Sequence, residues 1–146
     1  MKPTLLVVDD VPQIQQYLRH HLERAGYSIF TCSNGQEALD ILSQEQVDAV
    51  ITDLVMPVMD GATLGRSVQK SYGIPVILLT HASNIRPLEE SRTLARAEWA
   101  GIFTDVVMKP FHFFELQPVI EKAIGTLPIE DLGARPNEEY RDQHSA

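Results

Sequence analysis

Short apolar runs alternate with amphipathic stretches along most of this chain, and that alternation constrains its fold more than any other feature. Residues 5–8 form an uninterrupted apolar run, which is typical of a strand buried on both faces of a parallel sheet. After Pro12, apolar residues recur at spacings of three and four until Gly26, which predicts an amphipathic helix. The same reasoning predicts strands at 28–32, 49–52, 76–79 and 106–108, and helices marked by Ala38, Leu39 and Leu42, by Leu64, Val68 and Tyr72, by residues 84–99, and by Leu116, Val119, Ile120 and Ala123.

These strand–helix units predict an α/β fold with a doubly wound, five-stranded parallel sheet and helices on both of its faces. Right-handed crossover connections between parallel strands leave few other arrangements. The length of 146 residues corresponds to one domain. Apolar periodicity ends near residue 125, and prolines and acidic side chains follow. We therefore expect a domain over residues 1–125 and a polar, acidic C-terminal tail or linker over residues 126–146.

The composition argues against several classes of function. The formal net charge is −8 at pH 7, whereas a surface that binds nucleic acid needs clustered lysine and arginine side chains. No apolar run approaches the roughly 18 residues of a membrane-spanning helix. Cys32 is the only cysteine, so it has no partner for an internal disulfide, and the N-terminus shows no signal-peptide pattern. We expect a cytoplasmic domain that binds neither nucleic acid nor a membrane.

Polar residues stand at the ends of four predicted strands, where a buried strand would not choose them. The first strand ends in Asp9 and Asp10, the third in Asp53, the fourth in Thr80 and the fifth in Lys109. In a doubly wound sheet, the carboxyl ends of the strands meet at one edge, near the point where strand order reverses. Each residue alone is equally well explained as a helix cap or a surface charge. Their joint placement predicts one functional site.

The chemistry of that site follows from its charges. Three carboxylates in one crevice resist ionising together, and a divalent cation removes the conflict. Mg²⁺ suits a site built from a few carboxylates, water and phosphate oxygens. A lysine and a hydroxyl beside them supply the fixed positive charge and the donor that a transferring phosphoryl group needs. The sequence therefore predicts an aspartyl-phosphate site with Asp53 as the nucleophile.

Over about residues 4–125, the sequence resembles the receiver domains of two-component response regulators, in particular the chemotaxis-type single-domain regulators. The matching motifs are Leu5-Leu6-Val7-Val8-Asp9-Asp10, Ile51-Thr52-Asp53-Leu54-Val55-Met56-Pro57, Asp60-Gly61, Val76-Ile77-Leu78-Leu79-Thr80 and Met108-Lys109-Pro110-Phe111. The resemblance implies a flavodoxin-like sheet with strand order 2-1-3-4-5. It also implies that Asp10 and Asp53 ligate Mg²⁺ directly, that Asp9 acts partly through water, and that the Val55 carbonyl completes the shell.

The remaining motif positions have implied roles as well. Lys109 would pair with the phosphoryl oxygens, and Thr80 would move to donate a hydrogen bond to one of them. Pro57 and Gly61 would shape the loop after the acceptor, and the Lys109–Pro110 peptide bond would be cis.

The function implied by the resemblance is a phosphorylation-dependent signalling switch. The phosphoryl donor would be a sensor histidine kinase or a phosphotransfer protein, and the output would be an altered interaction with a downstream protein, with homodimer formation on phosphorylation as a further expectation. The domain would not be an enzyme beyond its own phosphoryl transfer and a slow self-dephosphorylation. Dephosphorylation should be slow because Val55 and Ala82, at the positions that help to place the attacking water, have no hydrogen-bonding side chain.

Three other functions are compatible with parts of this pattern. An aspartate-nucleophile phosphatase usually has a second acid two residues after the nucleophile, and Val55 stands there. A receiver-like docking module has no physical need for the complete set of Asp9, Asp10, Asp53, Thr80 and Lys109. A third alternative is the receiver fragment of a longer transcriptional or enzymatic regulator.

One departure from the family concerns the relay of the signal. Receivers usually carry an aromatic residue three positions before the lysine, and Val106 stands there in this chain. Either the coupling stops at the loop after Thr80, or the segment 81–105, with Phe103 and Trp99, carries the rearrangement, and we favour the second alternative.

Overall fold

The structure, a computed structural model, describes residues 2–81 and 101–127. Its strands are β1 (Thr4–Val8), β2 (Ser28–Cys32), β3 (Ala49–Thr52), β4 (Val76–His81) and β5 (Asp105–Lys109). Its helices are α1 (Pro12–Arg24), α2 (Gly35–Gln44), α3 (Gly61–Ser71) and α6 (Phe113–Ile124). The helix predicted over residues 84–99 lies outside the described residues, as does the predicted tail from residue 128 onward.

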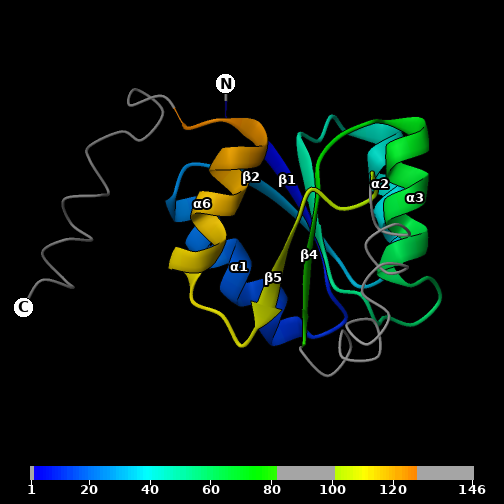
Figure 1. The fold of residues 1–146 in the computed structure, drawn as a ribbon, viewed down its shortest axis with the longest axis horizontal. Coiled ribbons are helices and arrows are strands. Elements are labelled where there is room, and N and C mark those ends of the chain that lie inside the picture. The colour runs from blue at the N-terminus through cyan, green and yellow to red at the C-terminus, as the bar shows by residue number, and fades with distance from the viewer. Residues whose placement is uncertain (1, 82–100, 128–146) are drawn as a thin grey trace, which may run out of the picture.

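The strands form one parallel sheet in the order β2-β1-β3-β4-β5. Helices α1 and α6 cover one face, and α2 and α3 cover the other (Figure 1). The predicted fold class and strand order are therefore confirmed. The direction of winding reverses between β1 and β3, which places the carboxyl ends of these two strands beside each other.

Two apolar layers, one on each face of the sheet, make up the core. Leu5 and Val7 of β1 join the layer beneath α1 and α6, and Leu6 and Val8 join the layer beneath α2 and α3. Successive side chains of a strand point to opposite faces, so a strand covered on both faces must be apolar throughout. This explains the uninterrupted apolar runs of the sequence.

One sequence expectation needs correction, and one core residue lies beyond the expected domain end. Tyr72 was expected to extend the apolar stripe of α3, but it is 42% exposed, because it is the C-cap residue and its backbone has left the helical path. Leu127 lies beyond the predicted domain end at residue 125, yet it is only 6% exposed and belongs to the core layer beneath α1 and α6. Within the described residues, no helix has the length and apolar content of a membrane span.

Tyr27 carries a buried hydroxyl that has no hydrogen-bond partner among the described residues, and its side chain is only 1% exposed. Burial, reinforced by the nearby charge of Glu121, raises the pKa of Tyr27 from 10.0 to about 12. A pKa that is raised in the folded state adds stability that is complete below pH 10 and is lost as the pH rises toward 12.

We predict that Tyr27→Phe stabilises the domain by about 1 kcal/mol at neutral pH, because it removes an unsatisfied buried hydroxyl. Between pH 10 and 12, ionisation of Tyr27 should cost the wild type about 2 kcal/mol of stability, and Tyr27→Phe should not show this loss. Urea unfolding of both proteins across pH 7–12 measures both effects. Both proteins should still lose some stability above pH 9, since burial raises the pKa of Cys32 from 9.0 to about 12. Identical pH profiles for the two proteins would contradict the prediction.

Candidate functional site

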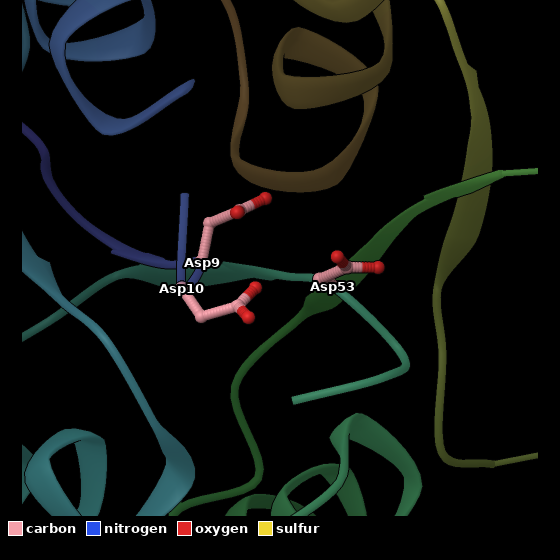
Figure 2. A group of neighbouring side chains, drawn as sticks. All are labelled: Asp9, Asp10 and Asp53. Atoms are coloured by element: carbon pink, nitrogen blue, oxygen red, sulfur yellow. The ribbon is translucent and has the colours of Figure 1, made fainter. Parts of the chain in front are cut away.

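Three carboxylates lie at the carboxyl ends of β1 and β3. Asp9 and Asp10 follow β1 directly, and Asp53 follows β3. The two strands are in register, with Val8 opposite Thr52, so the residues after them emerge at the same level. Each of the three carboxylates offers an oxygen within 4.8 Å of the others (Figure 2). Asp9 and Asp53 are buried and Asp10 is exposed, which gives the cluster one side open to solvent.

Lys109 connects this cluster to the far edge of the sheet. It lies at the end of β5, two strands away from β3. Its Nζ donates hydrogen bonds to Asp9 Oδ2 at 2.8 Å and to Asp53 Oδ2 at 3.1 Å. All three side chains are buried, so the ammonium group neutralises part of the negative charge inside a region that water barely reaches.

The protonation of the site reflects both burial and pairing. Burial raises the pKa of Asp9 above its usual value, although the Lys109 ammonium and the Val11 amide act in the opposite direction. Burial by itself would lower the pKa of Lys109, but its hydrogen bonds and charge interactions with Asp9 and Asp53 outweigh this and raise it. Lys109 therefore remains charged, and it lies between the carboxylates of Asp9 and Asp53.

Main-chain amides hold the two buried carboxylates in place. The Val11 amide donates to Asp9 Oδ1 at 2.9 Å, and the Leu54 amide donates to Asp53 Oδ1 at 2.7 Å. Gln15 was not predicted as a site residue. Its Nε2 donates to the Asp9 carbonyl at 2.6 Å and to the Cys32 carbonyl at 3.1 Å, which ties the turn after β1 to the end of β2. A glutamine early in a helix gives no such signal in sequence.

Thr80 and Val55 lie on elements next to those that carry the carboxylates, and they differ in burial. Thr80 is fully buried in β4, between the strands that carry Asp53 and Lys109, and it lies opposite Met108 of β5. Val55 is 59% exposed in the loop between Asp53 and α3. The structure thus brings Asp9, Asp10, Asp53 and Lys109 together, with Thr80 and Val55 on the adjoining strand and loop. Ala82 lies outside the described residues.

The loop after Asp53 is closed by a hydrogen bond between its ends, from the Gly61 amide to the Leu54 carbonyl at 2.8 Å. A Cβ atom on Gly61 would lie 2.1 Å from the Asp53 carbonyl oxygen, so only glycine fits at this position. The Lys109–Pro110 bond is cis, as the resemblance implied.

Phe103 packs against the core layer beneath α2 and α3. It precedes β5, and the following residue, Thr104, donates to the carbonyl of Val76 at the start of β4. Thr80, near the other end of β4, lies opposite Met108 of β5. The part of the expected relay that involves residues 82–100, Trp99 included, lies outside the described residues and stays a prediction.

The donor set fits a hard divalent cation. Three carboxylates with neighbouring oxygens, one of them exposed, are the ligands that Mg²⁺ prefers, and the open side leaves room for water or phosphate oxygens. The buried aspartate beside the lysine is equipped to receive a group that carries negative charge.

Comparison with known proteins places this geometry in a family. Residues 5–121 match the family model described as the response regulator receiver domain. The chain is 38% identical to the heme response regulator HssR of Staphylococcus epidermidis over 111 residues, which cover 76% of this chain and 46% of that protein. It is 31% identical to the probable transcriptional regulator ycf27 of Cyanidium caldarium over 132 residues, 90% of this chain and 50% of that protein. The chain spans about half the length of these curated relatives.

A solved structure agrees with the sequence matches. The crystal structure of the response regulator protein TrrA from Thermotoga maritima, in complex with Mg²⁺ and BeF, matches with a TM-score of 0.70 and 34% identity, over 84% of this chain and 99% of that one. The family match covers the three acidic residues, the lysine and the strands that carry them, and so the chain belongs to the response regulator receiver domain family.

Proposed function

We propose that this receiver domain accepts a phosphoryl group on Asp53 and thereby switches between two conformations. The observation that carries the proposal is the buried triad in which Lys109 contacts both Asp9 and Asp53. A structural ion pair needs only one carboxylate, whereas this lysine stands between two, beside a third acid that is exposed. Phosphoryl transfer to a carboxylate needs that combination of nucleophile, fixed cation and acidic metal ligands.

Each residue has a defined part in the transfer. A carboxylate oxygen of Asp53 forms a bond to phosphorus, while the bond from phosphorus to the donor breaks and its electron pair leaves with the donor. Lys109 stabilises the negative charge on the phosphoryl oxygens. Asp9, Asp10, Asp53 and the Val55 carbonyl would hold Mg²⁺, which supplies further charge neutralisation when bound. Hydrogen bonds from main-chain amides to Asp9 and Asp53 keep both carboxylates oriented before the donor arrives.

Phosphorylation would change the contacts around Lys109 and Thr80. The new group brings negative charge and acceptor oxygens, and Lys109 would shift from the Asp53 carboxylate to these oxygens. Thr80, which is buried on the neighbouring strand, would donate a hydrogen bond to one of them. Its movement would bias a two-state element near the end of β4.

The partners and setting are part of the proposal. The donor would be a sensor histidine kinase or a phosphotransfer protein, and the target another protein, with dimer formation on phosphorylation as a further route of output. A cytoplasmic setting is supported by the single, buried and unpaired Cys32. The length of the relatives favours a second candidate, in which this domain is the receiver part of a longer regulator.

Acetyl phosphate tests the proposed chemistry directly. With Mg²⁺ present, the intact mass of the wild-type domain should rise by one phosphoryl group, and the increase should disappear with a chelator or in Asp53→Ala. A phosphorylated Asp53→Ala protein would show that the acceptor is a different residue. Absence of labelling in the wild type, with the fold intact by circular dichroism, would refute the proposed function.

The lifetime of the phosphoryl group forms a separate prediction. Hydrolysis needs an oriented water, and the exposed Val55 side chain has no group to hold one. Val55→Asn adds a donor and an acceptor there, so we expect self-dephosphorylation to accelerate by about tenfold, less than the roughly 100-fold or more that a general acid or base gives, because asparagine only orients the water. Val55→Leu serves as the control of similar polarity. An unchanged or slower phosphate release in Val55→Asn would contradict the prediction.

A further inference from the structure

Met59 lies directly against the first residue of α2. The hydrophobic residues packed around the layer beneath α2 and α3 include Met59. A Cβ atom on Gly35 would lie 2.7 Å from Met59 Sδ and 2.9 Å from both its Cβ and Cγ. Because Gly35 has no side chain, it leaves the space that the Met59 side chain occupies. This contact joins the loop that follows Asp53 to the helix that follows β2.

The residue before Met59 lies in a strained turn. Val58 has φ 72°, in the left-handed region that a β-branched residue rarely adopts, and its side chain is 81% exposed. The Met59 amide donates to the Pro57 carbonyl at 2.8 Å, which closes a three-residue γ-turn around Val58. Strain of this kind persists only where neighbouring contacts hold the backbone. Because Val58 itself is exposed, the contact of Met59 with Gly35 is well placed to hold it.

The rest of the loop is held by Met56, which is buried in the layer beneath α2 and α3, and at its two ends. The Gly61 amide donates to the Leu54 carbonyl at 2.8 Å, and the Asp60 carboxylate caps α3 by accepting from the Thr63 amide at 2.7 Å. Val55 lies between the Leu54 end and the Val58 turn. The direction of its carbonyl therefore depends on two anchors, the buried Met56 next to it and the packing of Met59 beyond the turn.

We propose that Met59 is a positioning residue, and that its packing against Gly35 orients the Val55 carbonyl toward the metal. The inference rests on the proposed function, since it assigns that carbonyl to Mg²⁺. It makes a residue outside the acidic cluster responsible for metal affinity. It also predicts a specific kinetic signature: losing the packing should raise the Mg²⁺ concentration needed for phosphorylation, and leave the rate at saturating Mg²⁺ within about twofold of wild type.

Gly35→Ala is the most direct test. One of the close approaches is to Met59 Cβ, next to the main chain, so rotation of the thioether cannot relieve it and the loop backbone must shift. We expect the Mg²⁺ dissociation constant, measured from amide chemical shifts, to rise about fivefold, within the usual range for coupled contacting residues. Met59→Ala should raise it about threefold, and Met59→Leu, which keeps an apolar side chain of similar volume, should restore most of the affinity.

The double variant Gly35→Ala/Met59→Ala makes the test specific. Removing Met59 Sδ and Cγ eliminates two of the three close contacts, so this protein should bind Mg²⁺ more tightly than Gly35→Ala alone. Gly65→Ala is the matched control. Its Cβ would lie 2.5 Å from Ile102 Cγ2, a comparable clash that does not involve the acceptor loop. It should lower stability without changing the affinity for Mg²⁺.

The inference is wrong if folded Gly35→Ala and Met59→Ala both bind Mg²⁺ within twofold of wild type, or if the double variant is no better than Gly35→Ala. If Gly35→Ala does not fold, Met59→Ala and its rescue by Met59→Leu decide the question. Failure of the proposed function gives a different result: wild-type Asp53 would take no phosphoryl group, while the Mg²⁺ affinities would still follow the expected order.

Discussion

Gly61→Ala should destabilise the domain by about 3 kcal/mol and abolish phosphorylation of Asp53. The added Cβ would lie 2.1 Å from the Asp53 carbonyl oxygen and 3.0 Å from Leu54 Cα, and neither is a side-chain atom that can rotate away. The same carbonyl accepts a hydrogen bond from the Thr52 hydroxyl at 2.9 Å, so moving it also disturbs the end of β3. Relief of the clash must shift the main chain of Asp53 or that of Gly61 at the start of α3.

Urea unfolding and acetyl phosphate labelling together check this result. Gly73→Ala is the matched control, because Gly73 has φ 63° but a Cβ there would meet nothing within 4 Å. Its substitution should cost about 1 kcal/mol through backbone strain alone and leave labelling intact. A Gly61→Ala protein that is as stable as Gly73→Ala and still phosphorylated would show that the close approach is readily accommodated.

Lys109→Met should also lower stability by about 3 kcal/mol at neutral pH without divalent cations. The substitution leaves the buried carboxylates of Asp9 and Asp53 facing each other with no compensating charge. Burial already raises the pKa of Asp9, and loss of the lysine raises it further. A raised folded-state pKa adds stability that is complete below the unfolded value of 3.8 and is lost as the pH rises. The deficit should therefore be small near pH 4 and grow toward pH 7.

Phosphorylation of Lys109→Met should slow by about 100-fold, the usual effect of removing one group that stabilises transition-state charge. The double variant Lys109→Met/Asp9→Asn is the control for stability, since it removes the repulsion between the two buried carboxylates and leaves only Asp53 without its partner. It should recover part of the stability lost in Lys109→Met but none of its labelling rate. A Lys109→Met protein with wild-type stability at pH 7 would contradict the electrostatic account of the site.

The sequence by itself determined the fold class and the group of charged residues that meet at the strand ends. Strands covered on both faces must be apolar throughout, so their positions stand out as uninterrupted runs, and β1 and β3 are found where those runs lie. Polar residues at the ends of such runs have no packing role in the core. This is why Asp9, Asp53 and Lys109 could be selected before any of their contacts were known. The parallel topology then brings strand ends that are distant in sequence to one edge.

The tertiary structure decided how those residues meet and what supports them. Pattern reasoning cannot tell that one lysine contacts two aspartates, because this depends on the reach of a side chain across β4. It also missed the packing of Met59 against Gly35, and the burial of Leu127 beyond the expected domain end. These contacts join segments that are separated in sequence and carry no periodic signal. They depend on close packing in three dimensions, where a single added carbon is felt, and no spacing along the chain records it.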